Sequence, residues 1–180
     1  MRNTEKEIKR TFLNLLKTHD IESIDVMMIC NALNIKRQSF YYHYKNIYDV
    51  IYSMFDEADL EIDEEADFDT IIINLISYLF EHEEFNQEIL KSSAKDILEE
   101  FVFSYLYRSL NKYLEIYTLR VDATKDLGRF LAKGISYQIL YYFGHADYSK
   151  DEIYQKINYL INKDIIDYIV KNYKDIKNVR

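Results

Sequence analysis

Proline is absent from this chain of 180 residues, and glycine occurs only three times. Sheet-rich folds depend on tight turns, and tight turns depend strongly on these two residues. Hydrophobic residues make up 48% of the chain and charged residues 30%, which is typical of a folded protein with a sizeable core. The 18 tyrosines and 10 phenylalanines provide the large core side chains, since tryptophan is absent. We therefore predict an all-α fold.

The distribution of charge singles out one short stretch near the N-terminus. The whole chain carries a net charge of −8, yet residues 1–50 contain 8 basic and 6 acidic residues, a net +2, which leaves −10 for residues 51–180. No carboxylate lies between Asp25 and Asp49, where Lys36, Arg37, His43 and Lys45 are found. This basic stretch predicts an anionic partner, which the acidic remainder of the chain would repel.

The first half of this stretch has the pattern of a short helix followed by a turn. Asp25 is placed to cap the helix by accepting amide hydrogens of its first turn. Asn34 follows the helix where a tight turn favours a residue that tolerates positive φ. The apolar residues that form one stripe at i, i+3, i+4 and i+7 are Val26, Ile29, Cys30 and Leu33.

A second short helix is expected from Lys36. Phe40 and Tyr44 are spaced to point inward, which completes a helix-turn-helix. Its outward face is dense in side chains that donate hydrogen bonds to phosphates and base edges. These residues are Arg37, Gln38, Ser39, Tyr41, Tyr42 and His43.

The run IKRQSFYYHYKNIYDVI, following a helix and an Asn turn, resembles the DNA-binding segment of TetR/AcrR-type transcriptional regulators. In that family a short recognition helix ends in a Tyr-aromatic-His-aromatic run followed by Lys-Asn. The resemblance covers about residues 4–55, and the sequence looks most like the branch that includes regulators of dihydroxyacetone kinase operons. It implies a homodimer whose subunits each have a three-helix DNA-binding head and a larger helical body that dimerises and often binds a small effector. Two departures are Asn34, where the family usually has Gly, and Ile47, where many members carry a basic residue that contacts phosphate.

These observations assign roles to the residues of the predicted interface. Arg37 and Gln38 can reach base edges in the major groove, whereas Tyr41 is divided between packing and a phosphate contact. Thr4, near the start of the first helix, is a further candidate for a phosphate contact. The residues best placed for phosphates are Ser39, Tyr42, His43 and Lys45.

We expect a helix-turn-helix DNA-binding domain over residues 1–46 and a helical dimerisation and effector-binding domain over residues 47–180. The function that follows is a repressor that binds a palindromic operator as a homodimer. The alternative is a regulator-like interaction module or co-activator with weak or no DNA binding of its own. The modest charge of the head and the presence of Ile47 favour that alternative.

Helical spacing extends along most of the chain. A capping box at Thr4–Glu7 predicts the start of the first helix, and a second one at Ser149–Glu152 the start of the last. We expect further helices over residues 47–54, 68–81 and 95–118, and one capped by Asp122 or Thr124 that ends near Gly144. The acidic residues 82–93 form a broken segment, and the acidic run of residues 56–67 is a solvated loop rather than a metal site. The two C-terminal helices, the second extending past Ile169, carry wide apolar stripes that predict a four-helix dimer interface.

Other features of the sequence allow two readings. Aromatic residues of the body, represented by Tyr78, Phe101 and Tyr105, form either ordinary helical core or the wall of an effector pocket. The single cysteine, Cys30, is expected to be a buried apolar residue rather than a redox sensor. No catalytic constellation, metal-ligand spacing or cofactor motif is found, so we expect neither an enzyme nor a cofactor. The charged N-terminus and the lack of a long apolar window predict a cytoplasmic protein without a membrane span.

Overall fold

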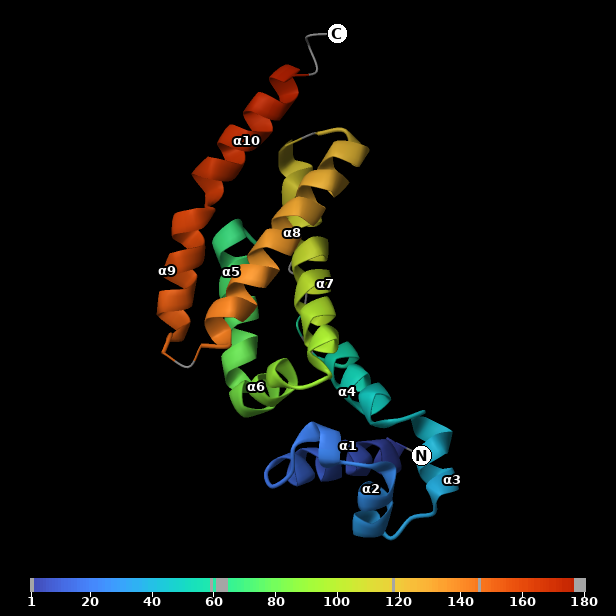
Figure 1. The fold of residues 1–180 in the computed structure, drawn as a ribbon. Coiled ribbons are helices and arrows are strands. Elements are labelled where there is room, and N and C mark those ends of the chain that lie inside the picture. Colours follow the sequence, from blue (N-terminus) through green and yellow to red (C-terminus); the bar gives the residue numbers. More distant parts are fainter. Residues whose placement is uncertain (1, 59, 61–64, 118, 146, 177–180) are drawn as a thin grey trace. The chain divides into compact units, whose positions relative to one another are not determined.

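The computed structural model describes residues 2–176 apart from residues 59, 61–64, 118 and 146. All the regular secondary structure of these residues is helical, with no strand among them, which confirms the all-α prediction (Figure 1). The chain forms two compact units. The first contains residues 1–59 and 82–101, and the second contains residues 60–81 and 102–180. The division into a DNA-binding domain of residues 1–46 and a body of residues 47–180 stays a prediction.

The first unit is built from short helices. The helix α1 packs against α2 and α4 and contacts α6, while α2 packs against α3. Residue Thr4 was expected to cap α1, but the helix begins at Arg2, so Thr4 lies within its first turn. The elements of this unit are α1 (Arg2–Leu16), the 3₁₀ turn η1 (Ile21–Ser23), α2 (Val26–Leu33), α3 (Arg37–His43), α4 (Ile47–Asp56) and α6 (Glu83–Lys91), together with the start of α7 (Lys95–Leu114).

Local chemistry explains where α2 ends and α3 begins. The carboxylate of Asp25 accepts the backbone N–H of Met28 at 2.8 Å and so caps α2. Asn34 adopts the left-handed conformation, with φ 52° and ψ 43°, where a short polar side chain is tolerated better than most. The chain leaves this turn in an extended conformation at Lys36 and re-enters a helix at Arg37. The predicted helix-turn-helix is therefore present.

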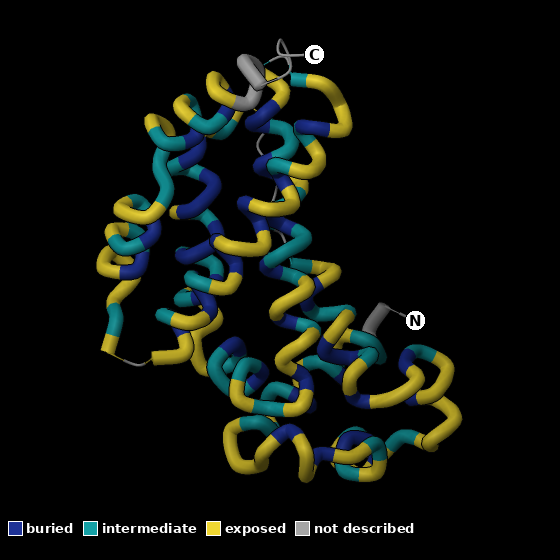
Figure 2. Tube along the Cα trace, turned by 45° about the horizontal axis from the view of Figure 1, so that its top comes forward, coloured by how far each residue is buried: buried dark blue, intermediate teal, exposed yellow. Residues whose placement is uncertain are grey.

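The core of the first unit draws residues from every helix of the motif (Figure 2, dark blue). Burial of each large apolar side chain contributes about 1.5–3 kcal/mol. Phe55 of α4 packs against Phe85 of α6 and Phe101 of α7, with ring centroids 5.4 and 4.9 Å away. Cys30 is buried, as expected, and burial raises the pKa of its thiol. The fully buried members of this core include Ile8, Phe12, Ile29, Phe40, Val50 and Ile51.

Residues 82–93 differ from the sequence prediction. They were expected to form a broken segment, but residues 83–91 form the helix α6. Ile89 is fully buried and Asn86 is buried on the same helix, whereas Glu83 and Glu84 occupy the exposed first turn. Acidic residues stabilise a helix in that turn. The apolar pattern is too sparse to identify the helix, which forms because its few buried residues meet a partner in α1.

The second unit contains longer helices. The helix α9 packs against both α5 and α8. The prediction for α5 agrees with the structure at both ends, and α8 ends at Gly144 as expected. Its N-cap is Arg120 rather than Asp122 or Thr124, and the first backbone bond of the helix runs from the Thr124 N–H to the Arg120 carbonyl at 2.9 Å. The elements are α5 (Phe68–Glu81), the rest of α7, the 3₁₀ turn η2 (Glu115–Tyr117), α8 (Val121–Phe143), α9 (Lys150–Leu160) and α10 (Lys163–Ile176).

The C-terminal segment contains a break that the sequence analysis did not predict. The capping box of Ser149 and Glu152 starts α9 as expected, with the Ser149 N–H donating to the Glu152 carboxylate at 2.8 Å. The single long helix predicted to follow is wrong, because Ile161 is extended and separates α9 from α10. The Asn162 side-chain oxygen accepts the Ile165 N–H at 3.1 Å, which satisfies a first-turn donor of α10.

Candidate nucleic-acid interface

The helix α3, the predicted recognition helix, has seven residues and one buried side chain, Phe40, in its middle. Phe40 is fully buried, and Tyr44, which directly follows the helix, is buried as well. With Phe40 turned inward, the two residues at the start of the helix, Arg37 and Gln38, are exposed. Ser39 is exposed too. The three polar side chains therefore project into solvent from the first turn, where a helix that enters a major groove makes its base contacts.

The two tyrosines of α3 differ in their surroundings. Tyr41 is 51% exposed, and its ring meets Phe40 edge-on with centroids 5.7 Å apart. The Tyr41 ring is thus partly packed and partly exposed, and a phosphate contact from Tyr41 stays a prediction. Tyr42 is 68% exposed and lies edge-on to the His43 ring at 5.0 Å. The phenol of Tyr42 is therefore free of the core and can reach toward a partner.

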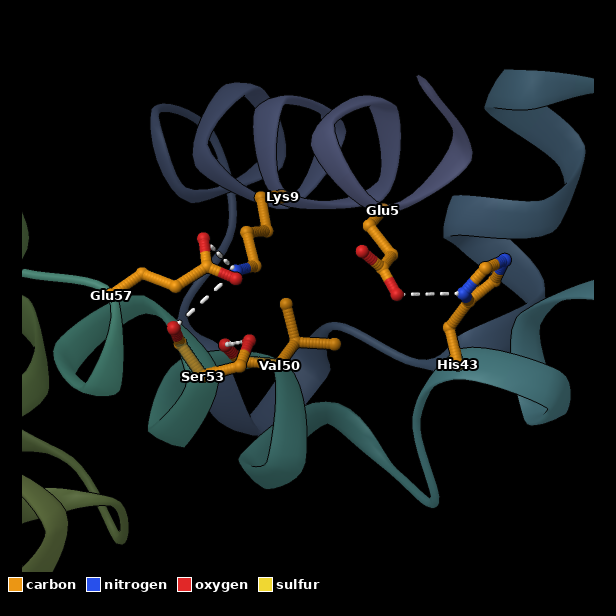
Figure 3. Close-up of polar contacts among 6 residues, drawn as sticks. All are labelled: Glu5, Lys9, His43, Val50, Ser53 and Glu57. Atoms are coloured by element: carbon orange, nitrogen blue, oxygen red, sulfur yellow. Dashed lines mark hydrogen bonds and ion pairs between the residues drawn. The ribbon is translucent and has the colours of Figure 1, made fainter. Parts of the chain in front are cut away.

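His43 lies differently from the other predicted contact residues. Its side chain is only 8% exposed, and its Nδ1 atom lies 3.0 Å from the Glu5 carboxylate of α1 (Figure 3). The sequence analysis assigned His43 to a phosphate but gave no role to Glu5. The two residues are 38 positions apart, so spacing along the chain offers no signal that they meet.

Lys45 lies in a tightly bonded turn between α3 and α4. Its backbone N–H donates to the Asp49 carboxylate at 2.9 Å, and the Asn46 side chain caps α4 by accepting the Asp49 N–H at 2.9 Å. The Lys45 side chain is exposed. The backbone of this lysine is therefore fixed while its ammonium group can reach a phosphate.

One ion pair reduces the positive charge that the first unit can offer to a nucleic acid. The Lys9 ammonium of α1 lies 2.6 Å from the Glu57 carboxylate and donates to the Ser53 carbonyl at 3.3 Å (Figure 3). Its side chain is therefore directed to α4. Ile47, where many TetR/AcrR members have a basic residue, is buried in the core. Thr4 is half-buried in the first turn of α1.

The three candidate ligand-binding residues are divided between the two units. Phe101 packs on Phe55 in the first unit. Tyr105 is buried and Tyr78 half-buried within the second unit, where burial raises the pKa of Tyr78 to about 12. Both positions in the second unit suit a packed aromatic core. An effector pocket that includes these residues stays a prediction.

A mostly apolar groove lies between α8 and α9, with a volume of about 510 Å³. Gly134 contributes to its wall, and a Cβ atom at this position would meet no atom within 4 Å. The exposed aromatic residues Phe130 and Tyr137 line it from α8, and Leu160 lines it from α9. Tyr78, Phe101 and Tyr105 are not among its lining residues.

The described residues define a class of fold, an all-helical chain that carries a helix-turn-helix near its N-terminus. Comparison of the sequence with family models gave no match, and comparison with curated proteins gave none either. Among solved structures, the chain is similar to the dihydroxyacetone kinase operon activator DhaS, with a TM-score of 0.64 and 22% sequence identity. The similarity covers 87% of this chain and 93% of that one. At this identity the likeness shows a shared fold.

Among the residues that the structure describes, no group of three or more His, Cys, Asp or Glu side chains is arranged to hold a metal ion. Within the same part of the chain, no helix combines the length and the apolar character needed to cross a membrane.

Proposed function

We propose that this chain is a TetR-like transcriptional repressor that binds a palindromic DNA operator as a homodimer in the cytoplasm. The observation that carries the proposal is the exposed face of α3. Arg37 and Gln38 project from its first turn, and Tyr42 from its last, on a helix whose remaining face is anchored by Phe40. The solved structure with a similar fold belongs to an operon activator, which supports a role in transcription.

The division of labour on α3 follows from geometry and chemistry. A bidentate contact from Arg37 to guanine, or from Gln38 to adenine, distinguishes base pairs in the major groove. Ser39, Tyr42 and Lys45 supply donors to the phosphate backbone, which sets the register of the helix but reads no sequence. Tyr41 and Thr4 are the remaining phosphate candidates.

Dimerisation is supported by the apolar surface of α8 and α9. Phe130 and Tyr137 are 75% and 67% exposed, and they stand along the same helix as the open space at Gly134. Large apolar groups in such a cluster mark an interaction surface. A second copy of the chain would cover it, and two heads would then face two half-sites related by symmetry. Binding of an effector or partner protein to the body would change the separation of the heads.

The test is a selection of genomic DNA fragments by the purified full-length protein, beside the double variant Arg37→Ala/Tyr42→Ala. Enrichment of a short palindrome by the native protein alone supports the proposal. A reporter placed behind that palindrome then distinguishes repression from activation by the sign of its response. If no sequence is enriched at moderate salt, the operator proposal fails.

Substitution of single contact residues should separate base reading from phosphate binding. Arg37→Ala should cost about 1–3 kcal/mol of discrimination at one operator position, while leaving binding to unrelated DNA nearly unchanged. Lys45→Ala should weaken binding to all DNA alike and reduce the slope of log affinity against log salt by about one. Titrations of operator and scrambled DNA at several salt concentrations measure both effects. An unchanged sequence preference in Arg37→Ala would refute the role given to Arg37.

A second candidate is an interaction module or co-activator with weak or no DNA binding of its own. The presence of Ile47 in place of a basic residue and the pairing of Lys9 with Glu57 favour it, because both leave fewer cations for phosphates on residues 1–50, whose net charge is +2. Under this alternative, Lys45→Ala would leave transcription of the regulated genes in the cell unchanged. Substitutions on the surface that binds the partner protein would instead abolish regulation of those genes.

A further inference from the structure

The contact between His43 and Glu5 carries information about the proton on the histidine ring. A carboxylate only accepts hydrogen bonds, so at 3.0 Å the Nδ1 atom must be the donor. In the neutral imidazole this leaves Nε2 without a hydrogen. Figure 3 shows Nδ1 directed at Glu5 and the other ring nitrogen directed away from it.

This arrangement works against the phosphate contact that the sequence predicts for His43. A phosphate oxygen is itself an acceptor, so a neutral ring that donates to Glu5 has nothing left to donate to DNA. The Glu5 carboxylate is also 45% exposed, and its negative charge would lie beside that of the phosphate. His43 is therefore better suited to joining α3 to α1 within the chain than to binding DNA.

The bond between His43 and Glu5 links the recognition helix α3 directly to α1. The helix α3 packs against α2, and α2 packs against α1. Within its seven residues α3 has Phe40 as its one fully buried side chain, and Tyr44 is buried directly after the helix. His43, the last residue of α3, adds a hydrogen bond to α1. A directional bond from the end of α3 to another helix restricts the tilt of its axis more than apolar packing alone does.

We infer that His43 is a positioning residue, which acts through Glu5 to set the angle at which α3 presents Arg37 and Gln38 to the major groove. This inference rests on the proposed operator binding, and it replaces the phosphate contact predicted for His43. It also gives an acidic residue, Glu5, a favourable role in binding an anionic partner. A tilt at the C-terminal end of α3 moves the long Arg37 side chain away from bidentate geometry, which tolerates only small displacements.

The two possible roles of His43 predict that removal of the Glu5 carboxylate changes operator affinity in opposite directions. If the pair positions α3, Glu5→Ala should weaken operator binding by about tenfold, as expected for loss of a hydrogen bond to a charged group. If His43 contacts phosphate independently of Glu5, removal of the nearby negative charge should instead strengthen binding. Glu7→Ala is the matched control, since it removes the same charge from the same helix two residues further on.

Two substitutions of His43 separate the roles of its ring nitrogens. The Asn side-chain nitrogen stands where Nδ1 stands, so His43→Asn can keep the bond to Glu5. The Gln side-chain nitrogen approximates Nε2, so His43→Gln keeps a donor for phosphate and loses the bond. We expect His43→Asn to bind operator within about twofold of the native protein and His43→Gln to bind about tenfold more weakly. The salt dependence should be unchanged in both, unlike that of Lys45→Ala.

Titrations of the selected operator at several salt concentrations, with melting curves to verify folding, give the decisive readings. The double variant Glu5→Ala/His43→Ala should bind no more weakly than either single variant, because the two residues act as one contact. Tighter binding by Glu5→Ala, or rescue by Gln rather than Asn, overturns the inference and leaves operator binding intact. If the native protein selects no DNA at all, the proposed function fails and this inference fails with it.

Discussion

Phe40→Ala is expected to lower the free energy of unfolding of the first unit by about 3–5 kcal/mol, the usual cost of removing a buried phenyl ring. The side chain is fully buried and is the central anchor of α3. Because the helix is only seven residues long, it cannot persist without that contact. Operator affinity should therefore fall to the level of non-specific DNA. Urea unfolding and hydrogen exchange of the α2–α3 amides measure the first effect, and DNA titration measures the second.

Tyr42→Ala is the matched control for this prediction, since it removes an aromatic ring from the same helix at a position that is 68% exposed. It should change the free energy of unfolding by less than about 0.5 kcal/mol, while still weakening DNA binding through loss of the proposed phosphate contact. If Phe40→Ala and Tyr42→Ala prove equally stable, the packing described for α3 is wrong. Hydrogen exchange localises the effect to α2 and α3, which matters because the chain has two compact units.

The double variant Phe130→Glu/Tyr137→Glu should convert the proposed dimer to a monomer at micromolar concentration. Both rings line the groove between α8 and α9 and are largely exposed in the single chain. Carboxylates there would have to be buried without partners in a dimer, which costs several kcal/mol for each charge. Without the second head, operator affinity should fall by about two orders of magnitude or more. Sedimentation velocity and titration of full and half operators measure the two effects.

Tyr52→Glu serves as the control for charge and for loss of an exposed tyrosine. Tyr52 is 57% exposed on α4 of the first unit and is not among the residues that line the groove. This variant should sediment like the native protein. A native protein that is already a monomer at micromolar concentration would contradict the dimer proposal, whatever the variants do.

Agreement between sequence and structure is best where a local interaction decides the outcome. The cap formed by Asp25, the left-handed Asn34 and the capping box of Ser149 and Glu152 each involve residues within a few positions of one another. The apolar stripe of α5 was equally informative, because a wide and regular stripe leaves little choice of structure. Local patterns of this kind were sufficient for the all-α fold and the helix-turn-helix.

Disagreement arises where a distant contact competes with a weak local pattern. The helix α6 carries many acidic residues and forms because Ile89 and Asn86 are buried in the first unit. The break between α9 and α10 is a local exception, where the Asn162 side chain accepts the Ile165 N–H and the apolar period of the segment concealed this cap. The acidic run of residues 56–67 lies partly outside the described residues, at 59 and 61–64.

The candidate interface divides in the same way. By itself the sequence determined most of the exposed face of α3, since side-chain directions follow from the helical period once Phe40 and Tyr44 face inward. It did not determine that His43, expected on the same face, is largely buried. Only the tertiary structure decided how these side chains are held and which cations are already paired. His43 meets Glu5, and Lys9 meets Glu57, across 38 and 48 residues of chain. A helical period describes the faces of one helix, whereas the pairing of two charged side chains depends on how separate helices pack.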